Sequence, residues 1–167
     1  MLQGRLVAFA REHGVATRQN PRLTLEDCKG QQEPDVVFYS AMAPAQETDV
    51  TVVNPCAWSY IAKTAKDTRK VAKLAHAKKC STYEEQAKER QHSFTPLVFE
   101  THGKMLDEVR KLIKSFAAST SGSSGLAVQS MVLDLAVTLV RGNALCARSA
   151  ISKSQRHQDV IRGARGS

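Results

Sequence analysis

The chain has 167 residues, of which 42% are hydrophobic and 24% charged, and its formal net charge is +8 with an isoelectric point near 9.5. This length and composition predict one globular domain with a real core and exclude an intrinsically disordered chain. The positive charge favours a polyanionic partner such as nucleic acid, although charge that serves only solubility is the alternative.

The four cysteines are scattered, with no CxxC and no Cys/His pair at zinc-ligand spacing. A structural zinc site and a disulfide framework are therefore disfavoured, and reduced thiols indicate a nuclear or cytoplasmic protein that is not secreted. The N-terminal segment is too polar and too short for a signal peptide. Because no run approaches about 18 apolar residues, we expect no contact with a membrane.

The first part of the chain predicts a helix followed by strands. Apolar residues recur at helical spacing over residues 2–13, and Gly14 is a typical residue to end such a helix. A short strand is compatible with the residues around Pro21. Two clearer strands follow, PDVVFYS at 34–40 and DVTVVNP at 49–55, and the medium loop between them favours antiparallel pairing.

The second part predicts a helix, a strand and further helices. Residues 57–79 contain no Gly or Pro and are rich in Ala and Lys, so they predict one long helix. FTPLVFETHG at 94–103 predicts another strand, and residues 105–116 carry the apolar stripe of a helix. A last helix is expected from Leu126, with a break at Gly142.

These elements give the order helix, short strand, strand, strand, helix, strand, helices. The predicted fold class is α/β, with a restriction-endonuclease-like αβββαβ core, a mixed central sheet and extra C-terminal helices. We expect a core over residues 1–118, a flexible linker over 119–125, a helical extension over 126–150 and a loose basic tail over 151–167.

Two carboxylates stand at the heads of the two apolar strands. Asp35 follows Pro34 and begins the first strand, and Asp49 begins the second, with residues 36–48 between them. If the strands pair, the two carboxylates come close, which requires either a raised pKa or a bound cation. Carboxylate ligation suits Mg²⁺ or Mn²⁺, which could activate water and offset charge on a scissile phosphate. The alternative is that each aspartate is only a turn residue.

Restriction-like nucleases carry a lysine two positions after the second acidic residue, where this chain has Thr51. The predicted downstream helix offers four lysines that could replace it, at helical steps of 3, 4 and 3: Lys63, Lys66, Lys70 and Lys73. As a set they are candidate phosphate contacts, and the alternative is a solvated helix face.

Pro-Asp, thirteen residues and a second aspartate, followed by a helix with KxxK, resembles the restriction-like endonuclease domain of non-LTR retrotransposons. DVTVVNP, FTPLVFETHG and LVRGNA also resemble stretches near the C-terminal ends of reverse-transcriptase polyproteins. The resemblance runs from about Leu6 to Arg148. It implies a Mg²⁺- or Mn²⁺-dependent DNA endonuclease that nicks target DNA, with the reverse transcriptase portion of a longer polyprotein as a partner.

By the resemblance, Asp35 and Asp49 match the metal ligands, and Lys70 and Lys73 match the lysines of a KxxKY motif. Leu74 stands where the family has its tyrosine. Lys66, one turn before Lys70, is the alternative catalytic lysine, and Glu12 and Glu100 are lesser candidates for further ligands.

Two other functions remain open for the same sequence. Thr51 and Leu74 favour a catalytically decayed nucleic-acid-binding domain of the same fold, and a protein-interaction module is the third possibility. Trp58 and Tyr60 are expected as core anchors rather than base-stacking groups.

Overall fold

The structure is a computed structural model that describes residues 2–20, 33–40, 43–118 and 125–164, with side chains described as far as residue 153. Its four strands form one sheet in the order β1-β2-β3-β4. The strands are β1 (Ala16–Gln19), β2 (Val36–Ser40), β3 (Ala43–Val53) and β4 (Ser93–Glu100). The helices are α1 (Leu2–Glu12), α2 (Ile61–Thr64), α3 (Lys70–Glu89), α4 (Asp107–Ala118) and α5 (Gly125–Ala164).

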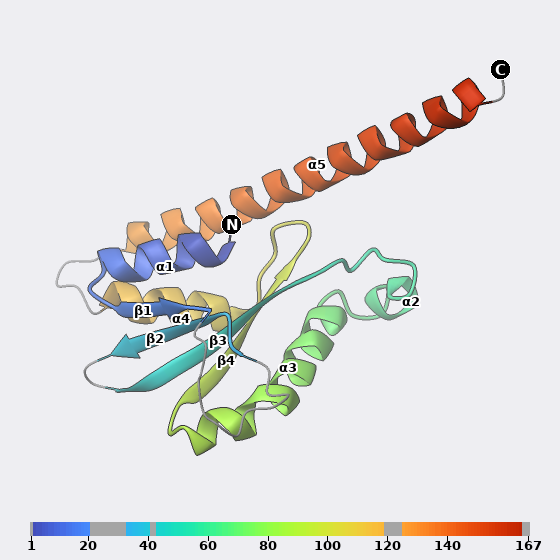
Figure 1. Cartoon of the computed structure of the whole chain (residues 1–167). Coiled ribbons are helices and arrows are strands. Elements are labelled where there is room, and N and C mark those ends of the chain that lie inside the picture. Colours follow the sequence, from blue (N-terminus) through green and yellow to red (C-terminus); the bar gives the residue numbers. More distant parts are fainter. Residues whose placement is uncertain (1, 21–32, 41–42, 119–124, 165–167) are drawn as a thin grey trace.

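The sheet is mixed, which confirms the predicted α/β class with a mixed central sheet. β1 pairs antiparallel with β2, and β2 pairs antiparallel with β3. β3 and β4 are parallel, because α3 carries the chain back across the sheet between them. Figure 1 shows α3 on one side of the sheet and α1, α4 and the first part of α5 on the other.

The main hydrophobic core lies between the sheet and the layer of α1, α4 and α5. Leu6 of α1, Phe38 of β2, Phe99 of β4 and Ile113 of α4 are buried in it. Strand residues alternate between the two faces, so the odd-numbered positions of β3 point instead toward α3. That second face is more polar, and Asp49 lies on it.

The expected single helix over residues 57–79 is wrong. α2 ends at Thr64 and α3 begins only at Lys70. Between them the Asp67 carboxylate accepts the backbone N–H of Arg69 at 2.9 Å, a local hydrogen bond that competes with a continuous helix. Beyond the predicted end, α3 runs on to Glu89.

The C-terminal organisation also differs from the expected one. α5 is continuous from Gly125 to Ala164, without a break at Gly142, and its helix includes most of the segment expected as a loose tail. Met131, Leu135 and Leu139 of α5 are buried in the main core, so this helix is part of the domain rather than an extension of it. Of the expected linker, residues 119–124 lie outside the described part of the chain.

By length and composition alone, the part of α5 from Gly125 to Lys153 could cross a membrane, with a mean hydropathy of 1.3. Core helices of soluble proteins meet the same criterion, so this is weak support for a membrane role. The expectation of no membrane contact stays a prediction.

Candidate functional site

The pairing of β2 with β3 brings the two predicted metal ligands together. Val36 lies opposite Thr48 in the antiparallel register, so Asp35, one residue earlier, lies opposite Asp49. The Asp35 Oδ2 accepts the backbone N–H of Val50 at 2.7 Å, which fixes this carboxylate against β3. Because Asp35 directly precedes β2, this hydrogen bond rather than a strand pairing places its carboxylate.

Asp49 is almost fully buried, with 7% of its surface exposed, and each of its oxygens has a partner. The Lys79 Nζ lies 2.9 Å from its Oδ2, and the Thr51 hydroxyl donates to the same oxygen at 2.9 Å. The Tyr83 hydroxyl donates to Oδ1 at 3.2 Å. A lysine and a tyrosine one turn apart on α3 therefore clamp this carboxylate from above the sheet.

Tyr83 reports the negative charge of both aspartates. Burial, then the charge of Asp49 and the hydrogen bond to it, and then the charge of Asp35 raise the pKa of Tyr83 to about 12. The phenol is therefore protonated at neutral pH and acts as a hydrogen-bond donor. Asp49 has the larger effect because it also accepts the Tyr83 hydrogen bond, whereas Asp35 acts on Tyr83 only through its charge.

The lysines expected from sequence are not the ones that contact the carboxylates. Because α2 and α3 are separate, the four do not form one helical stripe. Lys66 lies in the segment between the helices, and Lys73 pairs with Asp67 at 3.4 Å. Lys70 begins α3, nine residues before Lys79, which is about two and a half turns and places it on the other side of the helix.

Lys63 is the fourth of these lysines, and it lines a groove of about 660 Å³ beside Asp49. The groove lies between β3 and the helices α2 and α3, and the polar side chains along it are Thr51, Tyr60, Lys63, Lys78, Lys79 and Thr82. Thr51 and Lys79 contact Asp49 directly, so the groove opens next to the carboxylate pair. Its cationic lining suits a phosphate backbone.

Asp35 also borders a second cavity, of about 470 Å³, which lies between the start of α1, β3 and α5. Its walls are mainly apolar and include Val50, Val52 and Leu139. Asp35 thus borders an apolar cavity on the α1 and α5 side of the sheet, whereas the basic groove beside Asp49 lies on the α3 side.

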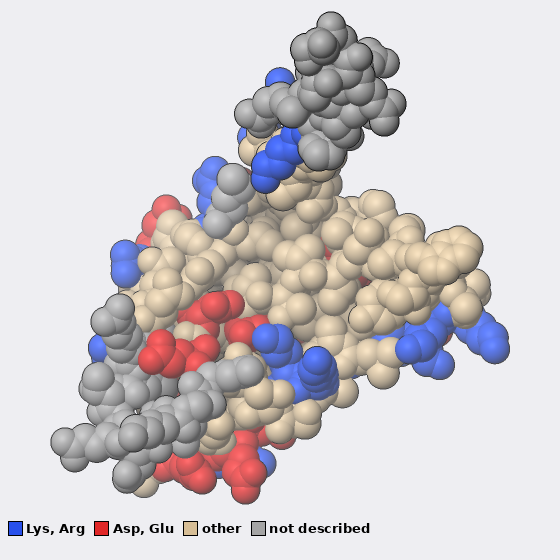
Figure 2. All heavy atoms as spheres, turned by 45° about the vertical axis from the view of Figure 1, so that its right-hand side comes forward, with Lys and Arg blue, Asp and Glu red and all other residues tan. Residues whose placement is uncertain are grey.

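The positive charge is not spread evenly over the surface. Figure 2, turned so that the side of Figure 1 carrying α2 comes forward, shows Lys and Arg in separate groups with uncharged surface between them and acidic groups beside some of them. The net charge of +8 therefore acts through local basic surfaces rather than through one continuous basic face on this side.

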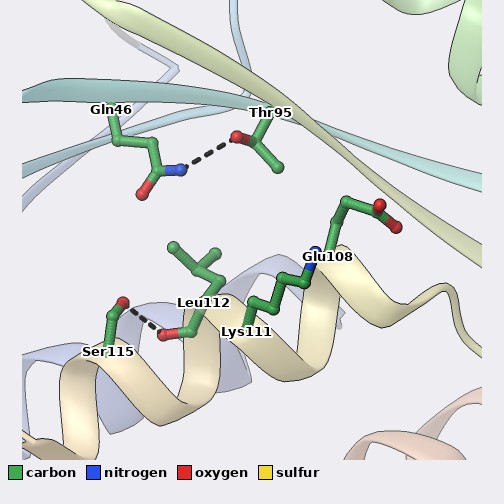
Figure 3. Close-up of a pocket in the computed structure, with 6 residues that line it drawn as sticks. All are labelled: Gln46, Thr95, Glu108, Lys111, Leu112 and Ser115. Atoms are coloured by element: carbon green, nitrogen blue, oxygen red, sulfur yellow. Dashed lines mark hydrogen bonds between the residues drawn. The ribbon is translucent and has the colours of Figure 1, made fainter.

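A third pocket, of about 300 Å³, lies between the sheet and α4, away from the carboxylates. Figure 3 shows Gln46 and Thr95 reaching into it from β3 and β4, opposite Glu108, Lys111, Leu112 and Ser115 of α4. The Gln46 amide donates to the Thr95 hydroxyl at 2.9 Å. Glu108 is the single carboxylate among the described residues that line this pocket, so the pocket lacks a pair of carboxylates for metal ligation.

The other predicted side chains do not join the site. Glu12 is exposed on α1. Glu100 is buried and lies opposite Val53 in the β3–β4 register, four residues and about 13 Å beyond Asp49 along the strand. Trp58 and Tyr60 were expected in the core, and that is wrong, because 92% and 36% of their surfaces are exposed.

Sequence reasoning missed Lys79 and Tyr83. Their spacing of four residues on a helix was visible in the sequence, but choosing them over the other lysines requires the rotation of α3 about its axis. That rotation is set by Val71, Ala72 and Ala87, which α3 buries against the sheet.

The site offers two acidic ligands for a cation. Among the described residues, no group of three or more His, Cys, Asp or Glu side chains gathers as a metal site. Mg²⁺ needs few protein ligands, since it commonly binds one or two carboxylates and keeps several waters. With Lys79 included, two carboxylates and one ammonium leave a net charge of −1, so the donor set fits a hard divalent cation.

No protein-family model matches this chain, and no curated protein matches it either. The residues of the site therefore carry the functional proposal.

Proposed function

We propose that the chain is a metal-dependent DNA endonuclease domain of restriction-endonuclease-like fold, which nicks target DNA as in retrotransposon integration. The observation that carries the proposal is that Asp35, directly before β2, is hydrogen-bonded to β3 next to Asp49, while Lys79 binds Asp49 beside a lysine-lined groove. The element order from α1 to β4 supports the finer fold assignment, because it is the αβββαβ order of that nuclease core.

In this proposal Asp35 and Asp49 hold Mg²⁺ or Mn²⁺. When bound there, the metal would activate a water and offset negative charge on the scissile phosphate. Asp35 is already oriented by the Val50 N–H, and Asp49 by Tyr83 and Thr51, so the carboxylates would need little rearrangement.

Lys79 takes the role that the sequence assigned to Lys70 or Lys66. Its ammonium lies against Asp49 at 2.9 Å, so it can donate to a phosphate oxygen or to the attacking water at the same place. Tyr83 stays protonated and holds Asp49 in position. Thr51 fills the strand position of the missing lysine and supports the same carboxylate instead.

The phosphate contacts are proposed to come from the groove, with Lys63 retained from the predicted set and Lys78 added to it. The biological setting implied by the resemblance, a nuclear domain that acts with a reverse transcriptase, is part of the proposal. A catalytically decayed DNA-binding domain is the second candidate, favoured by Thr51 in the lysine position and by the absence of an acidic third ligand among the described residues.

The test is nicking of supercoiled plasmid by the purified chain with Mg²⁺ or Mn²⁺, and with EDTA as the metal-free control. Asp35→Asn and Asp49→Asn should each abolish nicking, because asparagine keeps the shape and loses the charge that binds the metal. Asp107→Asn, an exposed carboxylate on α4, is the matched control and should nick like the wild type.

DNA binding without nicking in either metal would favour the decayed domain. If binding to DNA is also absent at low salt, both candidates are wrong, because a phosphate-binding protein loses affinity steeply as salt rises and should bind best there.

A further inference from the structure

Trp58, an aromatic side chain exposed to solvent, lies two residues before a residue that lines the groove beside Asp49. Tyr60 lines the groove, and the Lys63 Nζ lies 5.9 Å from the centre of the Tyr60 ring. Two residues before Tyr60, on the turn that leads from β3 to α2, Trp58 has 92% of its surface exposed. An indole left in water at such a position is typical of a contact surface.

The volume and chemistry of the groove suit one nucleic-acid strand. At about 660 Å³ it falls within the range of small-ligand sites, about 300–1,000 Å³, which fits a few nucleotides better than a double helix. Lys63 and Lys78 supply cations for phosphates, and Trp58 supplies a flat ring on which an unpaired base can stack.

We propose that this groove binds unpaired nucleotides of the DNA next to the cleavage position, with a base stacked on Trp58 and phosphates on Lys63 and Lys78. The inference rests on the proposed function, because it takes DNA as the substrate. It adds that the substrate is locally single-stranded, so the domain would prefer frayed, bulged or flapped DNA to a continuous duplex.

Trp58 is the single tryptophan of the chain, so its fluorescence reports this contact without a label. The experiment titrates the full chain, in EDTA to prevent cleavage, with a single-stranded dT12 oligonucleotide and with a blunt duplex of the same length. We expect saturable quenching by the single strand at lower concentration than by the duplex. Trp58→Ala, followed by anisotropy of labelled dT12, should weaken binding about 5- to 100-fold.

Two variants that each remove one lysine charge test whether the nucleic-acid strand runs along the groove. The plot of log affinity against log salt has a negative slope, and Lys78→Ala should make this slope less steep by about 0.7, the value for one phosphate contact on a single strand. Lys114→Ala, on the exposed side of α4 across the sheet, should leave the slope unchanged. Equal effects of the two variants, or duplex bound as tightly as single strand, would overturn the proposal.

These measurements separate the inference from the nuclease proposal, because they are made without cleavage. Quenching by dT12 together with plasmid that is never nicked would keep the strand site and reject the nuclease. Metal-dependent nicking that Trp58→Ala leaves at the wild-type rate, with no quenching of Trp58, would keep the nuclease and reject the strand site.

A second and independent inference comes from α5. While its buried face packs on the domain, its opposite face carries exposed side chains at alternating steps of four and three residues. These positions are Leu126, Ser130, Leu133, Val137, Val140, Ala144, Ala147 and Ile151. Such a 4-3 repeat is the pattern of a helix that packs along another helix, and here it extends over more than three heptads.

We infer that this stripe pairs with the same stripe of a second copy of the chain. A single continuous heptad seam is self-complementary, which fits a two-fold pair of identical helices. The small side chains at Ser130, Ala144 and Ala147 bury little area, so we expect a weak dimer with a dissociation constant in the micromolar range.

Sedimentation of the full chain in reducing buffer, over a range of concentrations, tests this. Val140 lies on the stripe and Leu145 lies off it, yet they are equally exposed, at 52% and 53%. Val140→Glu should abolish the concentration-dependent dimer, whereas Leu145→Glu should dimerise like the wild type. A wild type that stays monomeric at all concentrations, or equal loss of the dimer in both variants, would overturn the inference. A monomeric wild type that floats with phosphatidylcholine vesicles would overturn it in favour of binding to a membrane surface.

Discussion

Lys79→Ala is the substitution that most directly tests the assignment of the site. The Lys79 side chain is 29% exposed and its Nζ lies 2.9 Å from an Asp49 oxygen, so alanine removes the one ammonium that the described residues place on this carboxylate. Lys70→Ala and Lys73→Ala remove an ammonium from the same helix without touching Asp49, and they are the matched controls.

The expected magnitude follows from the position of each lysine. A preorganised donor at the reacting group is worth about 10²–10³ in rate, so Lys79→Ala should slow nicking by that factor. Lys73 pairs with Asp67 on the surface rather than with Asp49, and exposed pairs contribute only about 0–1 kcal/mol to stability. Lys73→Ala should therefore leave both the fold and the nicking rate close to those of the wild type. Lys70→Ala should behave like Lys73→Ala.

The assay is the initial rate of plasmid nicking at saturating Mg²⁺, with the midpoint of thermal unfolding measured on each variant. Lys79→Ala leaves Asp49 buried with only Tyr83 and Thr51 as donors, so some loss of stability, about 1–3 kcal/mol, is expected. The rate is therefore compared at a temperature where all variants are folded. A large loss of nicking in Lys70→Ala, with Lys79→Ala near wild type, would refute the assignment and restore the sequence-based one.

Three substitutions test the electrostatics and the core. Burial alone would raise the pKa of Glu47, but hydrogen bonds from Arg90 and His92 hold this pKa below its usual value of 4.5. The stabilisation by the ionised carboxylate is therefore present above pH 4.5 and is lost as pH falls through the lowered pKa. Glu47→Gln should make the midpoint of thermal unfolding less dependent on pH in the acid range. The pKa of Tyr83 is raised from 10.0 to about 12, so stability should fall between those pH values, and Tyr83→Phe should remove that alkaline loss. Leu135 of α5 is fully buried, and Leu135→Ala should cost about 2–5 kcal/mol of unfolding free energy in a denaturant titration, whereas a surface-bound α5 would give almost none.

Local signals in the sequence located the two strands and the two aspartates, but not the bounds of the second strand. Short apolar runs bounded by Pro and Asp predict β2 and part of β3. The predicted second strand at 49–55 omits residues 43–48, which are the part of β3 that pairs with β2, so Asp49 lies within β3 rather than at its start. The register that brings Asp35 next to Asp49 therefore depends on residues 43–48, which the sequence pattern assigns to a loop.

The choice of lysine could not be made in the same way. Residues 57–79 contain no Gly or Pro and are rich in Ala and Lys, and the local signal for the interruption is only the pair of weak helix formers Asp67 and Thr68. If the helix were continuous, Lys63, Lys66, Lys70 and Lys73 would lie along one face of it. Because the helix is interrupted, they do not. Which face of α3 meets Asp49 depends on side chains that pack against β4, a tertiary contact absent from the local pattern.

The exposure of Trp58 was missed for a related reason. A tryptophan beside a predicted helix is usually buried, and hydrophobicity alone assigns it to the core. Here the turn after β3 directs it outward, and α2, with four residues, buries none of its own side chains. Such a departure from local expectation is itself typical of a functional surface.

The charge of the site predicts that metal and DNA bind cooperatively. Asp35, Asp49 and Lys79 together carry a net charge of −1, which repels a phosphodiester, and a bound Mg²⁺ would reverse it to +1. We therefore expect Mg²⁺ to strengthen the binding of dT12 to the wild type beyond the value in EDTA, at constant ionic strength. In Asp49→Asn the metal-free site is already neutral and has lost a ligand, so binding in EDTA should be tighter than for the wild type and Mg²⁺ should add little. If Mg²⁺ weakens binding equally in both proteins, it acts only by screening, and the two aspartates do not hold a metal in contact with the DNA.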